Sequence, residues 1–213
     1  MSPSRHELIA RIQSTIETPV QSTIEKRLLE FKKFRTATNH DIFKELCFCI
    51  LTANCSAEMC LKVHEAIGDR FLTTDSSMEF TRMLKENKYR FYNVRGSYLE
   101  ESCQYRDNIK EILDEHEDEL NLREWLVKNV KGLGYKEASH FLRNVGYENL
   151  AIIDFHVIDI LCDHALIKKP KTLTKRRYLQ VEDVLRGISE ELEISLAALD
   201  LYLWYFETGK ILK

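Results

Sequence analysis

The chain has 213 residues, 44% of them hydrophobic and 31% charged, with a formal net charge of −3. The N-terminal residues lack the apolar core of a signal peptide, and no apolar run is long enough to span a bilayer. We therefore expect an intracellular globular protein, of the cytoplasm or nucleoid, whose six cysteines are reduced thiols and not a disulfide framework.

The apolar pattern predicts helices along the whole chain, and only three prolines and seven glycines interrupt it. The fold class that we expect is all-α, with at most short extended stretches. In chain order, the helices of the first half are expected at 5–17, at 20–36, at 43–51 with Asp41 as its N-cap, from Ser56 to about Phe71, from Asp75 or Ser76, and from about Val94 to the acidic residues that end at 119.

In the second half, two helices around residues 122–130 and 138–145 form a predicted hairpin, which Gly146 would end. Asp154 is the expected N-cap of the next helix. Its apolar stripe would be Phe155, Ile158, Cys162 and Ala165, and that of the last helix Leu192, Leu196, Leu199, Leu203 and Phe206.

The charges are distributed unevenly along the chain. Residues 111–119 carry six acids, and residues 168–177 carry six bases and no acid. The net charge alone argues against a nucleic-acid partner, but two surfaces of opposite sign remain compatible with one. We interpret the acidic run as solvated surface. For the basic run, solvated surface and nucleic-acid contact stay equal alternatives.

A Gly-x-Gly turn at residues 132–134 joins the two hairpin helices. Such a turn can offer Gly132 and Gly134 backbone N–H groups to a DNA phosphate, although many helical hairpins use glycine only to turn. Lys136 follows in the first turn of the second helix, where a cation is electrostatically unfavourable. The helix end and burial both favour the neutral amine, which can attack a sugar C1′ and form a Schiff base. A phosphate-contacting or solvated lysine is the alternative.

Asp154 offers Lys136 a catalytic partner. It follows the apolar run 150–153, which we expect to be buried, so that rigid backbone would place the carboxylate. A carboxylate that caps a helix is kept ionised by the backbone N–H groups. It can then stabilise an oxocarbenium-like sugar as the glycosidic bond breaks. An ordinary capping aspartate is the alternative, and the two roles are compatible.

Residues 131–138 and 152–157 resemble the hairpin and the catalytic-aspartate segment of the helix-hairpin-helix DNA glycosylases. The resemblance implies two all-helical subdomains with the active site in the cleft between them. It also implies that Lys136 is the Schiff-base lysine and Asp154 the catalytic carboxylate.

The domain organisation follows from the same resemblance. The chain 1–213 would form one glycosylase unit. One subdomain would cover 41–148 and carry the hairpin at about 122–146, and the other would combine 1–40 with 149–213.

Three further segments, 51–57, 90–95 and 203–213, resemble the archaeal-type group of 8-oxoguanine DNA glycosylase/AP lyases. In that group the chain ends on a lysine whose terminal carboxylate lies at the damaged base, and Lys213 has that position here. 8-oxoguanine carries a hydrogen on N7 that guanine lacks. An acceptor facing N7 is therefore satisfied by the lesion and left unpaired by guanine, which rejects the undamaged base.

Four more residues are candidates for contacts with DNA. Trp204 and Phe91 could stack on a base extruded from the duplex, and core packing is the alternative for both. Asn54 and Arg95 could fill the gap or hold the opposite strand, and ordinary polar residues at a helix end are the alternative.

The sequence predicts no metal site and no required cofactor. Endonuclease III relatives bind an iron–sulfur cluster through cysteines near the C-terminus, whereas the last cysteine here is Cys162, so we expect no cluster. The resemblance does imply a possible monovalent cation at the hairpin. Two other groups of potential metal ligands are better explained by core packing and solvation than by metal binding. They are the four cysteines Cys47, Cys49, Cys55 and Cys60, and the set His156, Asp159 and Asp163.

These observations predict a bifunctional glycosylase/AP lyase that acts on double-stranded DNA containing 8-oxoguanine, as a monomer and without a membrane partner. Two alternatives remain open. One is a related glycosylase for another oxidised base, and the other is a hairpin module that binds DNA without catalysis.

Overall fold

A computed structural model describes residues 4–211. Over these residues the chain forms thirteen α-helices and one short 3-10 helix and no strand, which confirms the all-α prediction. No helix among the same residues is both long and apolar enough to cross a membrane. The chain divides into two compact units, one made of Met1–Lys33 with Gly146–Lys213 and one made of Phe34–Val145. We call them unit 1 and unit 2.

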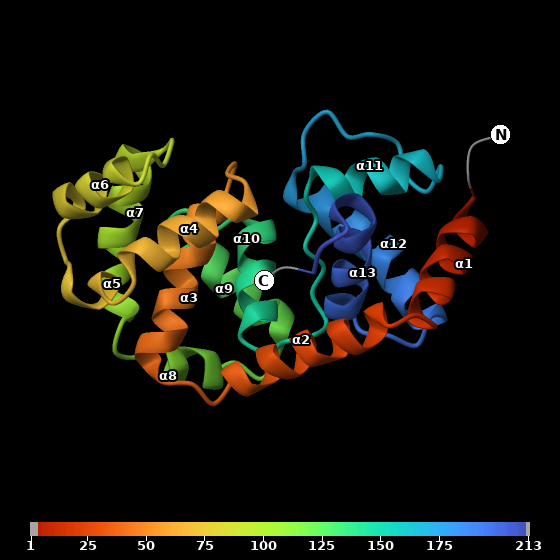
Figure 1. The fold of residues 1–213 in the computed structure, drawn as a ribbon, viewed down its shortest axis with the longest axis horizontal. Helices are drawn as coiled ribbons and strands as arrows, with labels where there is room; N and C mark the ends of the chain where they lie inside the picture. Colours follow the sequence, from red (N-terminus) through yellow and green to blue (C-terminus); the bar gives the residue numbers. More distant parts are fainter. Residues whose placement is uncertain (1–3, 212–213) are drawn as a thin grey trace. The chain divides into compact units, whose positions relative to one another are not determined.

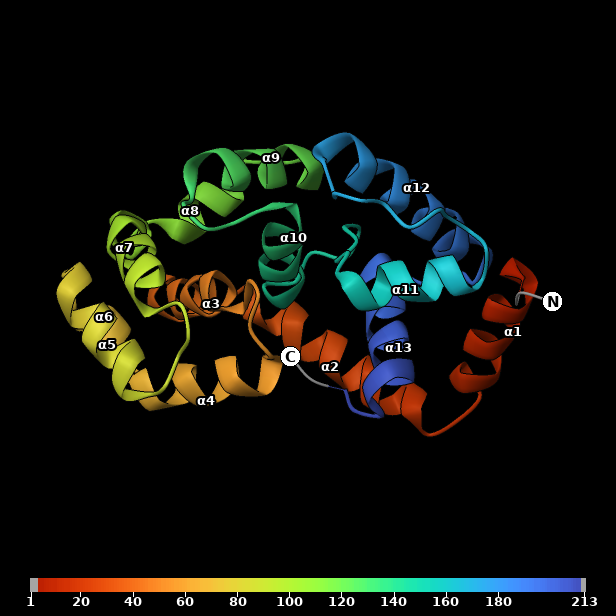
Figure 2. The same cartoon turned by 90° about the horizontal axis from the view of Figure 1, so that it is seen from above.

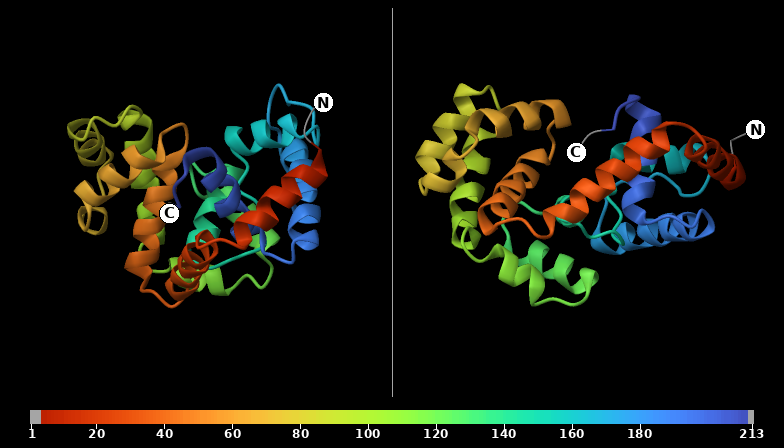
Figure 3. Two further views of the ribbon diagram at one scale, coloured as in Figure 1. Left: turned by 45° about the vertical axis from the view of Figure 1, so that its right-hand side comes forward. Right: turned by 60° about the horizontal axis from the view of Figure 1, so that its bottom comes forward.

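Unit 2 is built around α3, a helix buried over most of its length. Figures 1 and 3 show α4 near the C-terminal end of α3 and α8 near its N-terminal end, and α5, α7 and α10 also pack against it. The helices of this unit are α3 (Asn39–Thr52), α4 (Ala57–Ile67), α5 (Arg70–Thr73), α6 (Ser77–Glu86), α7 (Tyr92–Ser102), α8 (Ile109–Asp114), α9 (Glu119–Asn129) and α10 (Tyr135–Asn144), with the 3-10 helix η1 at Cys103–Tyr105.

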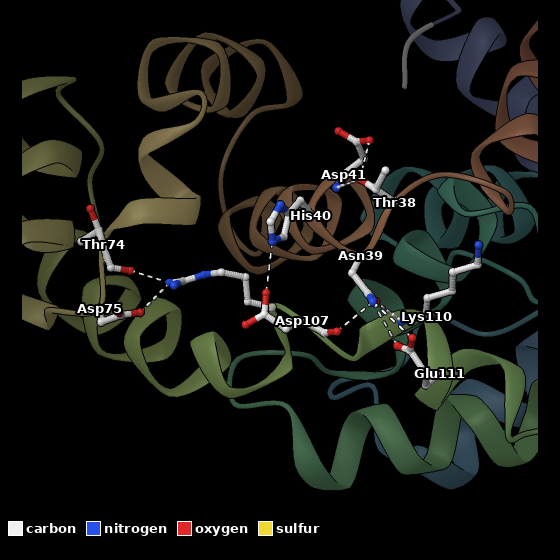
Figure 4. Close-up of polar contacts among 10 residues, drawn as sticks. Thr38, Asn39, His40, Asp41, Thr74, Asp75, Asp107, Lys110 and Glu111 are labelled. Carbon is white, nitrogen blue, oxygen red and sulfur yellow. Dashed lines mark hydrogen bonds and ion pairs between the residues drawn. The ribbon is translucent and has the colours of Figure 1, made fainter.

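The start of α3 corrects one prediction. Its N-cap is Thr38, whose hydroxyl accepts a hydrogen bond from the Asp41 backbone N–H at 3.2 Å. Asp41 lies inside the first turn, and its carboxylate accepts from the same hydroxyl at 2.7 Å. Thr38, three residues earlier in the chain, is thus the N-cap (Figure 4), and the Asp41 carboxylate only holds its hydroxyl in place.

The long helix expected from Val94 to residue 119 is broken into α7, η1 and α8. The break is held by side chains from other elements (Figure 4). The Asn39 side chain donates to the Asp107 carbonyl at 2.8 Å and accepts from the Lys110 N–H at 2.7 Å, while Arg106 reaches the Thr74 carbonyl at 2.7 Å. The two Asn39 bonds satisfy backbone groups of Asp107 and Lys110 that a continuous helix would have paired internally, and the Arg106 bond ties the break to the end of α5. Similarly, α4 stops at Ile67 because Gly68 follows with a φ of +53°.

Unit 1 contains α1 (Arg5–Ile16), nearly all of α2 (Val20–Phe34), α11 (Phe155–Asp163), α12 (Lys175–Glu191) and α13 (Leu196–Thr208). Helix α13 packs against both α11 and α12, and Figure 2 shows its crossing with α11. Helix α12 was not among the predicted helices, although Tyr178, Val181, Leu185 and Ile188 recur at helical spacing and are buried.

The predicted stripes of α11 and α13 are only partly right. In α11, Ile158 is buried, but Phe155 is 68% exposed and Ala165 lies beyond the helix with a φ of +56°. In α13, Leu196, Leu199 and Leu203 are buried as predicted, whereas Leu192 is the C-cap of α12 and Phe206 is half-buried.

Candidate functional site

The hairpin places Lys136 at the second residue of α10, as the sequence predicted. Its side chain is 24% exposed, and its Nζ lies 3.9 Å from Oε1 of Glu137. The Glu137 carboxylate also turns back to accept from the Gly134 backbone N–H at 3.3 Å. The helix start is therefore neutralised by an adjacent carboxylate, and the lysine amine stays within reach of solvent.

Gly132 is required by the geometry of the turn. Its φ is +89°, a conformation that L-residues rarely adopt, and a Cβ added there would lie 2.5 Å from Cδ2 of Tyr98. The Tyr98 ring on α7 thus occupies the space that a side chain at residue 132 would need. The Arg95 guanidinium in turn lies 5.3 Å from the centre of the Tyr98 ring.

Side chains join the two helices of the hairpin. The Tyr135 hydroxyl donates to Glu124 at 2.5 Å, and the buried Arg123 donates to the Ser139 hydroxyl at 3.2 Å. Arg123 also stacks its guanidinium 5.2 Å from the centre of the Tyr135 ring. Because α9 and α10 are tied by these contacts, the turn that carries Lys136 is held by more than its own backbone.

Asn54 lies in the loop between α3 and α4, and Arg95 contacts the same loop. Asn54 is exposed and adopts a φ of +59°, which asparagine tolerates better than most residues. Arg95 is buried and donates to the Ala53 carbonyl at 3.2 Å. In this structure Arg95 supports the loop that presents Asn54, a role that the sequence had not indicated.

Phe91 lies at the N-cap of α7 and is half-buried. The Arg90 guanidinium lies 5.0 Å from the centre of its ring. The ring therefore has one cationic neighbour and a partly accessible surface. Stacking of Phe91 on a base stays a prediction.

Asp154 is the N-cap of α11, which confirms the local prediction. Its carboxylate accepts from the Val157 backbone N–H at 3.0 Å. The preceding residues Leu150, Ala151, Ile152 and Ile153 are all buried, as expected, and they have no helical assignment. The carboxylate therefore follows an extended segment that is fixed inside unit 1.

Two residues of α12, neither of them predicted as a site residue, fix that extended segment. The Tyr178 hydroxyl donates to the Ala151 carbonyl at 2.6 Å and accepts from the Ile153 N–H at 3.2 Å. The Glu182 carboxylate accepts from the Ala151 N–H at 3.0 Å. These bonds satisfy backbone groups that would otherwise be buried without partners. An acid and a tyrosine spaced four apart in an otherwise apolar stripe could have suggested this role.

Trp204 on α13 lies beside the first turn of α11 within unit 1. Its ring meets His156 edge to face at a centroid distance of 5.7 Å, and His156 lies 3.5 Å from Glu207. The Trp204 indole is half-buried, and its Nε1 is shielded from solvent without a hydrogen-bond acceptor among the described residues. A buried donor without an acceptor of this kind is unusual in a folded protein.

The structure leaves three further predictions to report: the pairing of Lys136 with Asp154, the position of Lys213, and the basic run 168–177. Lys136 belongs to unit 2 and Asp154 to unit 1, so their pairing stays a prediction, and Lys213 lies outside the described residues. All six bases of 168–177 are exposed, and Lys169 pairs with Asp159 at 2.5 Å. Among residues 4–211 no three His, Cys, Asp or Glu side chains gather as metal ligands would.

Comparison with known proteins decides the family. A family model described as 8-oxoguanine DNA glycosylase matches residues 24–194. A relative from Methanocaldococcus jannaschii, named 8-oxoguanine DNA glycosylase/AP lyase, is 47% identical over 207 residues, which are 97% of this chain and 99% of the relative. The chain belongs to the 8-oxoguanine DNA glycosylase family. The resemblance found in the sequence is thereby confirmed.

Solved structures of the family share the fold. A crystal structure of the M. jannaschii 8-oxoguanine glycosylase/lyase, in complex with a 15mer DNA containing 8-oxoguanine, matches with a TM-score of 0.93 and covers 97% of this chain and 99% of that one. The 8-oxoguanine DNA glycosylase of Thermotoga maritima is 39% identical, with a TM-score of 0.90 and coverage of 98% and 99%.

Proposed function

We propose that this chain removes 8-oxoguanine from double-stranded DNA and then cuts the strand at the abasic site, with Lys136 as the nucleophile. The observation that carries the proposal is the near full-length similarity to 8-oxoguanine DNA glycosylase/AP lyases. The position of Lys136 directly after the hairpin turn supports its role. The enzyme would work on genomic DNA inside the cell, as a monomer and with no cofactor, because the lysine itself supplies the reactive group.

In the proposed reaction the neutral Lys136 amine attacks C1′ of the damaged nucleotide, and the C1′–N9 bond breaks as the C1′–N bond forms. The base leaves and takes up a proton. The amine then loses a proton and the C1′–O4′ bond breaks, with O4′ taking up a proton, so that the opened sugar carries the Schiff base at C1′. The Schiff base makes the C2′ proton acidic, and β-elimination expels the 3′ phosphate. Asp154 stabilises the positive charge that develops on the sugar, and its helix cap fixes the carboxylate for that task.

The binding contacts are part of the same proposal. The turn at Gly132 and Gly134 holds a phosphate, Asn54 contacts the duplex, and Arg95 acts through the loop that carries Asn54. Phe91 and Trp204 stack on the extruded base. Lys213 takes the base-recognition role that the resemblance implies.

A monovalent cation at the hairpin is also proposed. The Val130 carbonyl accepts from the Leu133 N–H at 3.2 Å and keeps a second lone pair, so it can serve as an oxygen ligand. Such a cation would lie beside the phosphate-binding turn and offset the charge of the DNA backbone.

Borohydride trapping on a duplex with one 8-oxoguanine tests the proposal. The wild-type chain should form a covalent complex, and Lys136→Gln should abolish it, because the variant lacks the amine that forms the Schiff base. Lys131→Gln is the matched control: Lys131 lies in the same hairpin, its side chain is 62% exposed and it pairs with Glu101 at 3.7 Å. It should leave trapping intact.

The alternatives are outcomes of this experiment. Trapping that survives Lys136→Gln would contradict the nucleophile. Trapping on an oxidised pyrimidine, with none on 8-oxoguanine, would favour another substrate. Binding of DNA with no trapping by the wild-type chain would favour a non-catalytic hairpin module.

A further inference from the structure

Two cysteines flank the start of α4. Ser56 is the N-cap of this helix, and its hydroxyl accepts from the Met59 N–H at 3.3 Å. Cys55 therefore occupies the residue before the cap, and Cys60 the fourth helical residue. Side chains at these two positions pack against each other in the hydrophobic staple that fixes how a chain enters a helix. The helix start thus brings two sulfur atoms together.

The two thiols differ in exposure and in acidity. Cys55 is half-buried, and Cys60 is fully buried. A hydrogen bond from Cys60 lowers the pKa of the Cys55 thiol to about 7, and the Ser56 backbone N–H and the charge of Arg95 act in the same direction against burial. The same hydrogen bond and burial raise the pKa of Cys60. An accessible thiolate with a protonated partner is the arrangement of a redox-reactive pair.

The surroundings link this pair to the candidate site. The Cys60 sulfur lies 3.3 Å from the Leu51 carbonyl, which also accepts from the Tyr89 hydroxyl at 2.5 Å. The charge of Lys136 reaches Cys60, and Cys55 directly follows Asn54. A chemical change at the two sulfurs would therefore alter both the loop that presents Asn54 and the neighbourhood of the Lys136 amine.

We propose that Cys55 and Cys60 form a peroxide-sensitive dithiol that closes reversibly to a disulfide. The Cys55 thiolate attacks hydrogen peroxide, the O–O bond breaks, and a sulfenic acid and, after protonation, one water result. The Cys60 thiol then attacks the Cys55 sulfur, forming the S–S bond and releasing a second water. Two thiols lose two electrons, and one peroxide is reduced to two waters. A dithiol reductant reverses the change.

The effect of this disulfide on DNA repair rests on the proposed function, whereas the formation of the disulfide is independent of that function. Closing the bond takes the Cys60 sulfur away from Leu51 and ties the residue after Asn54 to α4 covalently. We expect oxidised protein to excise 8-oxoguanine several-fold more slowly and to recover when the disulfide is reduced.

Mass spectrometry on the full chain tests the site. After limited hydrogen peroxide and alkylation of the free thiols, the tryptic peptide 45–62, which carries four cysteines, should lose two hydrogens, and fragmentation should place the bond between Cys55 and Cys60. Cys103 and Cys162 are internal controls, because burial raises the pKa of Cys103 to about 11 and also raises that of Cys162. Both should remain alkylated.

Two variants separate the steps. Cys60→Ala should form a sulfenic acid on Cys55 more slowly than the wild-type protein, because the hydrogen bond to Cys55 is lost, but the sulfenic acid should then persist and be trapped by dimedone, whereas wild-type protein should show little. Cys55→Ser should excise 8-oxoguanine at the wild-type rate but become insensitive to peroxide. A disulfide at other positions, or oxidation of Cys103 or Cys162 as fast as Cys55, would overturn the proposal. A Cys55–Cys60 disulfide without any change in excision would keep the redox site and remove only its effect on repair.

Discussion

The hairpin turn and the Asp154 segment hold their proposed catalytic residues in opposite ways. The hairpin is set mainly by nearby residues: Gly132 supplies a positive φ, and Glu137 caps the N–H of Gly134 three residues earlier. The Asp154 segment has no regular structure, and its bonds come from Tyr178 and Glu182, more than twenty residues along the chain. A conformation that depends on neighbouring residues can be predicted from a short sequence motif, whereas a conformation held by side chains far along the chain cannot.

The largest effect that we expect comes from Asp154→Asn. Asparagine caps helices as well as aspartate does, so the variant removes the charge and keeps the cap. Base release should fall by about 10²–10³-fold, the usual loss when one stabilising group is removed from a charged transition state. DNA affinity should change little. Single-turnover excision and DNA binding, measured on the same preparation, separate the two quantities.

Asp118→Asn is the matched control for that substitution. Asp118 caps α9 through bonds from the Leu120 and Asn121 N–H groups, so it is the same residue in the same local role. Excision should be unchanged. Equal losses in both variants would reduce Asp154 to a structural cap.

Gly132→Ala tests how the hairpin turn is held and should have an intermediate effect on stability and DNA affinity. The variant meets both an unfavourable φ and the Tyr98 ring, and strain of this kind costs about 1–3 kcal/mol. The melting temperature should fall by roughly 2–4 °C per kcal/mol, and DNA affinity should fall with it. Gly209→Ala is the control: its φ is +65°, but nothing lies within 4 Å of the added Cβ.

A double substitution sharpens the result for the hairpin. If the ring is the obstacle, Tyr98→Ala should recover part of the loss in Gly132→Ala, with a coupling of about 0.5–3 kcal/mol in thermal or denaturant unfolding. Strict additivity of the two substitutions would show that the backbone conformation alone matters at Gly132.

The smallest effect is expected from Tyr178→Phe. Loss of the hydroxyl leaves the Ala151 carbonyl and the Ile153 N–H buried without this partner, at a cost of about 1–3 kcal/mol. Excision should slow several-fold through a lower kcat, with KM nearly unchanged, because the buried hydroxyl acts on the segment that carries Asp154. Tyr202→Phe removes another buried hydroxyl of unit 1 that faces Glu25, and it should leave kcat unchanged.

The same contrast explains how far the sequence could lead. The all-α fold, the hairpin and the caps at Ser56 and Asp154 were predicted correctly, because each depends on residues within one turn of a helix. The cap at Asp41 and the continuous helix after Val94 were wrong, because Thr38 and Asn39 compete for the same backbone groups. The supporting role of Arg95 could not be predicted, because it joins residues far apart in the chain. The role of Tyr178 was missed although its spacing from Glu182 was a signal, because the spacing does not name the backbone groups that the hydroxyl pairs with.

The division of the chain also sets the order in which the two units can fold during synthesis. Unit 2 is continuous, whereas unit 1 joins the first helices to the last ones. Helix α1 finds its partners on α12 and α13: Arg5 donates to the Gly187 carbonyl at 3.0 Å, and Arg11 covers the Phe206 ring at 4.1 Å. At about 5–20 residues per second, these partners leave the ribosome on the order of ten seconds later. Unit 2 can therefore fold on the nascent chain, whereas the apolar face of α1 stays without its partners until α12 and α13 have been synthesised.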